Sequence, residues 1–264
     1  MELCAADSRS GLCAPTFIDG KLMVCARDSG EVCTLEAGSL TPALVCGAPS
    51  AICGEGGVLY VCDMVYQGVL RHEEGQLSGL VKEYEAKLFK GPSSITIDGA
   101  GNIFFLDSGP LGETTLANPK GSAFQITEAQ LLQPLALECL AHPSAIVVGH
   151  DQRTLYITEM MTNRLLRLVQ RAGVFHASIF HQFSGRMGPS GVVCSSKTGH
   201  LYVSHYDFPS TGAKGLVSVL SADGKLVREI EVPAAEVTGI ALSPEQDAIF
   251  VTEASTKSIY TCSV

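Results

Sequence analysis

Short runs of alternating apolar and polar residues recur along the chain, separated by turns rich in Gly, Pro, Asp and Ser. In the clearest example, Pro92 opens a strand that contains Ile95 and Ile97, a Gly-rich turn follows, and a second strand ends at Asp107. A two-residue period is typical of a half-buried β-strand, and two such runs joined by a tight Gly-rich turn predict a hairpin. One hairpin alone buries too little surface to be stable, so we expect further copies.

The second strand of this hairpin occurs six times. Its copies end between 37 and 52 residues apart, a spacing typical of propeller blades. They lie at residues 21–26, 58–63, 102–107, 154–159, 200–205 and 248–253. Because the six copies extend over the whole of residues 1–264, we expect a single domain.

The other strands of the unit repeat as well. First strands, most of them opened by a proline, are predicted at residues 15–18, 49–52, 92–95, 143–146, 189–192 and 237–240. Third strands are predicted at residues 31–35, 69–72, 123–126, 165–168, 216–220 and 259–262, and fourth strands at residues 77–84, 176–180 and 226–232. Four antiparallel strands in each of six repeats predict an all-β, six-bladed β-propeller.

Two segments complete this prediction. The sixth repeat lacks a fourth strand, so we expect residues 1–8 to supply it and to close the ring. Residues 127–140 are compatible with a turn or two of helix or with a long loop.

The net charge and the cysteines indicate which binding partners and which cellular compartment to expect. A net charge of -9 argues against binding to nucleic acid or anionic membranes, which attract a surplus of Lys and Arg. The first seven residues lack the basic and apolar regions of a signal peptide, so we expect none. We also expect no membrane span, because the most apolar stretch, residues 131–148, is interrupted by polar residues and prolines. Ten cysteines without a C-x-x-C pair favour free thiols in a reducing compartment, and hence an intracellular, cytoplasmic protein.

Two sets of repeated residues are expected at one mouth of the central channel, because the first strand begins where the antiparallel second strand ends. The inner set is a ring of hydroxyls: Thr16, Ser50, Ser93, Ser144, Ser190 and Thr238. The outer set consists of Ala26, Asp63, Asp107, Glu159, His205 and Glu253. Both sets could simply bond to backbone groups at strand ends, but four acids at one mouth could also hold a cation.

The repeats resemble the SMP-30/gluconolactonase/LRE-like propellers, which are related to the strictosidine synthase-like proteins. The resemblance rests on Gly91-Pro92-Ser93 with residues 101–109, on residues 118–122, and on residues 200–206 with 215–219. It extends over the whole chain at the level of the repeat. It implies the propeller fold and, in active members, hydrolysis of lactones or organophosphates.

The resemblance also implies a metal site, in which a divalent cation, usually calcium, is held by a Glu and by Asn or Asp residues. The Glu position is Cys13 here, and the Asn or Asp positions are Ser93, Ser144 and Ser190. Neutral hydroxyls and a thiol are poor ligands for a hard cation. We therefore expect no cofactor, with calcium or another divalent cation at the outer acids as the alternative.

Few other residues of the sequence suggest a catalytic role. His205 could act as an acid or base, although a single hydrogen bond at a strand end is commoner, and Cys13 could be a nucleophile or an inert thiol. Two long loops, residues 108–121 and 206–215, are expected to overhang the same mouth. Their candidate contact residues are Glu113, Lys120 and Phe208.

The loss of the metal ligands favours a non-enzymatic propeller that serves as a binding or structural subunit for other proteins. The alternative is a metal-assisted hydrolase of lactones or related esters, with a small molecule bound at the mouth. Its rearranged acidic site would consist of Asp63, Asp107, Glu159, His205 and Glu253.

Overall fold

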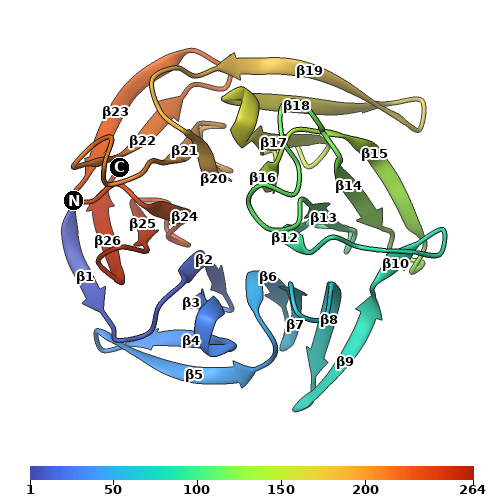
Figure 1. Ribbon diagram of the computed structural model, residues 1–264, viewed down its shortest axis with the longest axis horizontal. Helices are drawn as coiled ribbons and strands as arrows, with labels where there is room; N and C mark the ends of the chain where they lie inside the picture. The colour runs from blue at the N-terminus through green and yellow to red at the C-terminus, as the bar shows by residue number, and fades with distance from the viewer.

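The computed structural model describes residues 1–264 and confirms the six-bladed propeller. Six four-stranded antiparallel sheets surround a central channel (Figure 1). Blade 1 consists of β2 (Leu12–Ile18), β3 (Lys21–Ala26), β4 (Glu31–Glu36) and β5 (Ser39–Val45). Blade 2 consists of β6 (Pro49–Glu55), β7 (Val58–Asp63), β8 (Gly68–Glu73) and β9 (Gln76–Val81). Blade 3 consists of β12 (Pro92–Ile97), β13 (Ile103–Asp107), β14 (Gly121–Ile126) and β15 (Leu132–Leu140).

The remaining three blades repeat this order from the channel outward. Blade 4 consists of β16 (Pro143–Val148), β17 (Thr154–Glu159), β18 (Arg164–Arg171) and β19 (Val174–Gln182). Blade 5 consists of β20 (Gly188–Cys194), β21 (Leu201–Tyr206), β22 (Gly215–Leu220) and β23 (Leu226–Val232). Blade 6 consists of β24 (Val237–Leu242), β25 (Ala248–Glu253), β26 (Ser258–Ser263) and β1 (Glu2–Ala6). Two 3₁₀ turns follow second strands: η1 (Arg27–Ser29) and η2 (Met160–Thr162).

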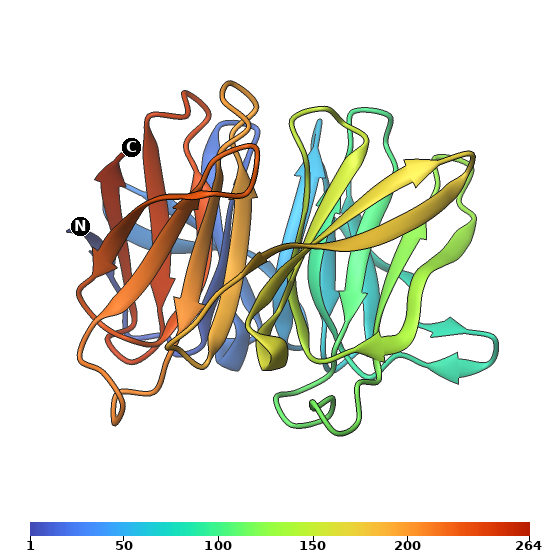
Figure 2. The same cartoon turned by 90° about the horizontal axis from the view of Figure 1, so that it is seen from above.

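The N-terminal strand closes the ring as predicted. β1 runs antiparallel to β26, with Glu2 opposite Thr261 and Ala6 opposite Ser258. The two ends of the chain consequently lie in the same blade (Figures 1 and 2). This pairing covers the edge of the last sheet, which would otherwise expose unpaired backbone groups.

The outer strands depart most from the sequence predictions. Residues 132–140 form β15, not a helix or loop, and β5 was not predicted. Most of their residues are exposed, so these strands lack the apolar alternation that marks a strand. The predicted fourth strand at residues 77–84 is divided into β9 and a small hairpin, β10 (Glu83–Tyr84) with β11 (Lys87–Leu88), that projects from the blade edge (Figure 1).

The core lies between neighbouring blades. In one cluster, Phe104 and Leu106 of blade 3 pack with Ile146 and Ile157 of blade 4. Each fully buried side chain of this size contributes about 1.5–3 kcal/mol relative to its exposed state. The inner strands are thereby held as a rigid frame around the channel.

All ten cysteines are free thiols. No helix of the protein has the length and apolar character that crossing a bilayer requires.

A cavity at the mouth of the channel

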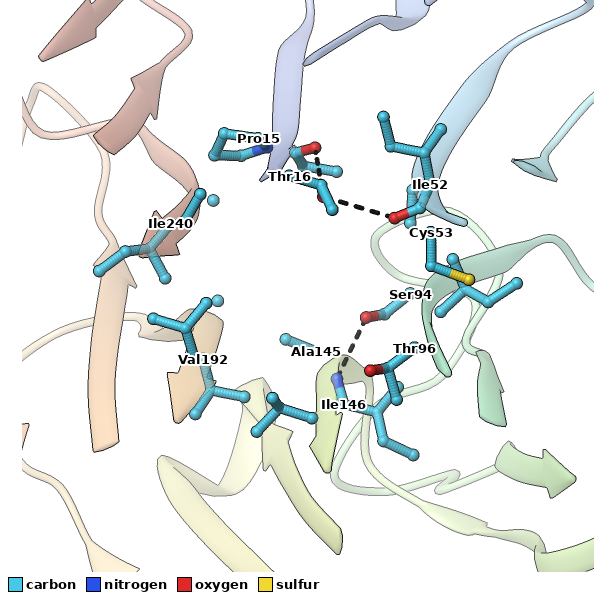
Figure 3. A pocket seen from close by; sticks show the side chains of 18 of the residues that line it. Pro15, Thr16, Ile52, Cys53, Ser94, Thr96, Ala145, Ile146, Val192 and Ile240 are labelled. Carbon is cyan, nitrogen blue, oxygen red and sulfur yellow. Dashed lines mark hydrogen bonds between the residues drawn. The ribbon is translucent and has the colours of Figure 1, made fainter. Parts of the chain in front are cut away.

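A cavity of about 490 Å³ opens at the mouth formed by the starts of the first strands and the ends of the second strands. Below it, a narrower channel of about 340 Å³ runs between the six inner strands. Ile52, Ile146, Val192 and Ile240 line this channel, but their side chains are buried and turn away from its centre toward the neighbouring blades (Figure 3). A ligand in the mouth therefore meets polar groups at the rim and the inner strands of the blades below.

A ring of inner residues separates the mouth from the channel and, at every position except Ser190, links one blade to the next. Ser50 Oγ donates to the Pro92 carbonyl at 2.5 Å, Ser93 to Pro143 at 3.1 Å, and Ser144 to Pro189 at 2.7 Å. Thr238 Oγ1 closes the circle by donating to the Leu12 carbonyl at 2.6 Å. Ser190 breaks the pattern, because its partner is Ser204 of the same blade at 3.1 Å.

The blade 1 member of this ring is Cys13 and not Thr16, which corrects the prediction. Leu12 lies opposite Ala26, as Pro49 lies opposite Asp63, so Cys13 takes the place of Ser50. Its Sγ lies 3.7 Å from the Ser50 carbonyl and 4.0 Å from the Pro49 carbonyl of the next blade.

Thr16 lies deeper, in the channel, where it donates to the Ile52 carbonyl at 3.4 Å (Figure 3). The register shifts between Cys13 and Thr16, because a bulge formed by Ala14 and Pro15 interrupts β2. A proline at the start of the other inner strands made Pro15 look like their equivalent, whereas it is part of this bulge.

The carboxylates of the outer acids accept hydrogen bonds from the segments next to their second strands. We call this arrangement a clamp. Asp63 is fully buried and accepts four amide hydrogens, from Gly47 and Ala48 before the blade and from Val65 and Tyr66 after β7. A carboxylate that accepts several backbone N–H groups is a strong, charge-assisted anchor. This carboxylate is therefore fully occupied by its own blade.

Asp107 makes only the first half of this arrangement, because it accepts from the amides of Lys90 and Gly91, before the blade, at 3.1 and 2.9 Å. Burial raises its pKa, and the amide hydrogens of Lys90 and Gly91 partly offset this. Asp107 lines a small separate cavity of about 110 Å³ beneath the β10–β11 hairpin, not the mouth.

Glu159 and Glu253 complete the set of buried acids. Glu159 accepts from the Ala141 amide at 2.7 Å, from the Thr162 hydroxyl, and from Arg164 Nε at 2.5 Å. Glu253 accepts from the amides of Glu236 and Thr256 and from two hydroxyls of the following turn. The structure thus distributes the four acids over four blades, and no three His, Cys, Asp or Glu residues approach closely enough to hold a metal ion.

His205 occupies the equivalent position in blade 5. It is 2 % exposed, its Nε2 pairs with Ser218 Oγ at 2.9 Å, and its ring packs edge-on against Phe183. Burial lowers its pKa to about 4, with smaller contributions from Arg186 and His181. His205 does not line the mouth cavity, although the next residue, Tyr206, does.

Two mouth residues that the sequence did not single out carry the chemistry most suited to a reaction. His142 is 8 % exposed, and burial lowers its pKa, so the imidazole is neutral at pH 7. Its Nδ1 lies 3.5 Å from Thr114 Oγ1, while Nε2 has no protein partner and is not sealed in the interior. Arg27, in η1, lines the same cavity, and its Nε lies 3.8 Å from Asp28 Oδ1.

A weak sequence signal existed for both residues. His142 precedes the proline of blade 4, where blades 2 and 3 have Ala48 and Gly91. Arg27 directly follows Ala26, the one outer position without a polar side chain. In each case an unusual residue interrupts the repeat.

Both long loops extend from the mouth face, as Figure 2 shows for the segments around residues 115 and 210. The first loop contributes Ser108, Gly109, Pro110 and Leu111 to the cavity wall. None of the three expected contact residues, Glu113, Lys120 and Phe208, is part of this wall.

Cys13, Ser93, Ser144 and Ser190, the positions that correspond to the family's metal ligands, all line the mouth cavity. The positions that the resemblance implied thus lie together beside one cavity. The donor set nevertheless does not fit a hard divalent cation, because it has no carboxylate and its hydroxyl hydrogens are mostly directed at carbonyls or at another hydroxyl.

Solved structures with the same fold include a gluconolactonase from Xanthomonas campestris and a calcium-binding protein, regucalcin, from Agrobacterium tumefaciens. The first superimposes with a TM-score of 0.81 at 20% identity over 98% of this chain and 87% of the other. The second has a TM-score of 0.80 at 21% identity over 96% and 85%. At this identity the similarity establishes the fold alone.

Among curated proteins, the chain is 28% identical over 144 residues to the lactonase drp35 of Staphylococcus haemolyticus. The match includes 53% of this chain and only 41% of the relative's length. Lactonases drp35 of other staphylococci match to a similar extent.

These relatives contradict the prediction of a non-enzymatic binding or structural subunit, because the proteins that the chain matches are named as enzymes. The loss of metal ligands was read as a loss of activity. The hydrolase alternative agrees better with the relatives.

The family model of the SMP-30/gluconolactonase/LRE-like region matches residues 3–255, which is nearly the whole chain. The match includes blades 1 to 5, strands β24 and β25 of blade 6, and the ring that surrounds the mouth. The chain therefore belongs to the SMP-30/gluconolactonase/LRE-like family.

Proposed function

We propose that this protein hydrolyses lactones or related cyclic esters in the mouth cavity. The observation that supports this most strongly is the combination of neutral His142 and cationic Arg27 in one cavity, above a ring of neutral hydroxyls. The cavity, at about 490 Å³, has the size of a small-molecule site. The lactonase relatives support the same reaction class.

Each group has a role that its chemistry suits. Ring opening of a lactone places negative charge on the carbonyl oxygen, and a nearby guanidinium such as that of Arg27 stabilises this charge. The unpartnered Nε2 of a neutral imidazole such as His142 can accept a proton from the attacking group. The oxygens of the hydroxyl ring retain lone pairs that can accept hydrogen bonds from hydroxyls of the substrate.

The reaction is assigned to the mouth and not to the outer acids, because each acid is committed to amides or side chains of its own blade. No step is assigned to a divalent cation. Activity is accordingly expected to persist in excess chelator.

The test is ring opening of a panel of γ- and δ-lactones, some bearing hydroxyls, followed by acid release in a pH-stat with excess EDTA. We expect turnover above buffer, reduced at least ~100-fold in His142→Gln and ~10-fold in Arg27→Gln. His176→Gln and Arg71→Gln change the same residue types at the periphery of blades 4 and 2, and should leave the rate unchanged. No turnover by the unmodified protein on any lactone would exclude the proposed function.

A further inference from the structure

A third set of repeated residues lines the mouth cavity beside the inner hydroxyls. In each blade it is the residue that directly follows the outer position at the end of the second strand. We call this set the wall ring, and its members are Arg27, Met64, Ser108, Met160, Tyr206 and Ala254. Because all six line the cavity, their side chains determine which ligands the mouth accepts.

The fold positions the wall ring through backbone bonds, which leave the side chains free to vary. The amide of Met64 donates to the Ala48 carbonyl at 3.0 Å, and the amide of Met160 donates to the His142 carbonyl at 3.0 Å. Equivalent bonds in blades 1 and 6 measure 3.2 and 2.9 Å. A backbone bond does not select a side chain, so the frame of the propeller does not require methionine at either place.

Blades 2 to 4 give the cavity an apolar wall, which consists of Met64, Pro110, Leu111 and Met160. A Cβ on Gly188 of blade 5 would lie 2.7 Å from Met160 Cγ, so this glycine makes room for the thioether. The loop that carries Leu111 is held against the protein, because Thr114 within it is fully buried. Methionine is unbranched and polarisable, and it therefore adapts to apolar ligands of different shape.

The same cavity offers few partners to a ligand that carries many hydroxyls. No Asp, Glu, Asn, Gln or Lys lines it. Four hydroxyls of the inner ring already donate to carbonyls of the next blade, those of Ser50, Ser93, Ser144 and Thr238. Ser108 Oγ donates to the Gly109 carbonyl at 2.9 Å. The ring oxygens can accept from a hydroxyl at the floor, but a hydroxyl buried against the apolar wall would lose its bonds to water without replacement, which is costly.

We propose that the mouth selects lactones that carry an apolar substituent and discriminates against sugar lactones. This inference rests on the proposed function, to which it adds the substrate class. The ester group lies near His142, whose carbonyl accepts from the Met160 amide, and the substituent extends along the apolar wall toward Leu111 and Met64. A largely apolar pocket with a few polar groups is the usual form of a small-molecule site.

The test measures binding, so it does not depend on turnover. Lactams have the shape of lactones but resist hydrolysis, and NMR titration can compare 5-alkyl-2-pyrrolidinones of increasing chain length with glucono-δ-lactam. We expect the dissociation constant to fall ~3-fold for each methylene added between the methyl and butyl compounds. Glucono-δ-lactam should bind more weakly than 5-methyl-2-pyrrolidinone.

Two variants test whether the apolar wall causes this dependence. Leu111→Asn and Met64→Gln each place a polar group in the wall, and each should remove most of the gain from the longer chain. Leu116→Asn is the matched control, because Leu116 lies in the same loop, is 69 % exposed and does not line the cavity. This control should keep the full dependence on chain length.

Three results would overturn the inference: binding that does not change with chain length, tighter binding of glucono-δ-lactam, or the same dependence in all three variants. Hydrolysis of sugar lactones alongside any of them would leave the proposed function intact. Binding that strengthens with chain length, without turnover of any lactone, would support the selectivity of the mouth and exclude the proposed function alone.

Discussion

Two sets of residues repeat around the same mouth, and they have different roles in the structure. The outer acids Asp63 and Glu253 are completely buried and hold loops through backbone amides. The inner ring is partly open, links blade to blade and lines the cavity. The acids attracted attention in the sequence because of their charge. Charge alone did not distinguish a structural clamp from a reactive group.

The exceptions to the repeats are more informative than the repeats. Blade 1 departs from both sets: Cys13 replaces a hydroxyl, and Ala26 replaces a polar side chain and is followed by Arg27. Blade 4 adds His142 before its proline. A residue that a repeating frame does not require is free to serve a substrate, and these three exceptions lie beside one cavity.

The largest expected effect in this comparison is the loss of an outer clamp. Asp63→Ala leaves four amide groups without their acceptor in a buried position, and each such group costs about 1–3 kcal/mol. We expect the free energy of unfolding to fall by at least about 3 kcal/mol in urea titration. A loss below about 1 kcal/mol would show that the clamp is dispensable.

The second effect concerns His205, the imidazole of the outer set. Its pKa of about 4 in the folded protein lies below its ordinary value of 6.5, so the unfolded chain binds the proton more readily as the pH falls. His205 therefore does not change the free energy of unfolding above pH 6.5. Its protonation in the unfolded chain should lower that free energy by about 3 kcal/mol at pH 4.

His205→Gln removes this titration. Urea unfolding measured from pH 7.5 to 4 should show a shallower loss of stability than in the unmodified protein, with His176→Gln as the control at an exposed site. Identical slopes in all three proteins would mean that His205 is accessible to protons in the fold, as a site residue would be.

The smallest effect compares two serines of the inner ring. Ser144 bridges to Pro189 of the next blade, whereas Ser190 bonds only within its own blade. Ser144→Ala should destabilise the fold by about 1 kcal/mol, and Ser190→Ala by less. Equal losses in thermal unfolding would argue against the role of the ring in linking blades.

The fold followed from the sequence because the second strand of every blade is buried and strongly patterned. The outer strands β5 and β15 escaped, since exposed strands need no apolar alternation. Proline was the marker for the start of the inner strands, and it failed at Pro15, which lies three residues further along its strand than Pro49, so Thr16 was chosen in place of Cys13. Ala14 and Pro15 pack closely against Gly239, a contact across more than 200 residues that no local pattern reveals.

The sequence brought part of the lining of the mouth cavity to attention and missed the rest. The resemblance placed Cys13, Ser93, Ser144 and Ser190 at the mouth, where they lie. His142 and Arg27 reach the same cavity from segments outside the repeated strand pattern, so no periodicity marked them. The prediction of a non-enzymatic protein was wrong because a lost metal ligand was equated with a lost reaction, whereas the relatives that the chain matches are named as enzymes.

The most direct measurement compares initial rates of lactone hydrolysis, in excess EDTA, for His142→Gln and Asp107→Asn. Asp107 belongs to the outer set and accepts only two amide hydrogens, so asparagine should be tolerated there. We predict that Asp107→Asn keeps the rate of the unmodified protein and that His142→Gln loses it by at least ~100-fold. Loss of activity in a folded Asp107→Asn, with full activity in His142→Gln, would contradict this account of the mouth.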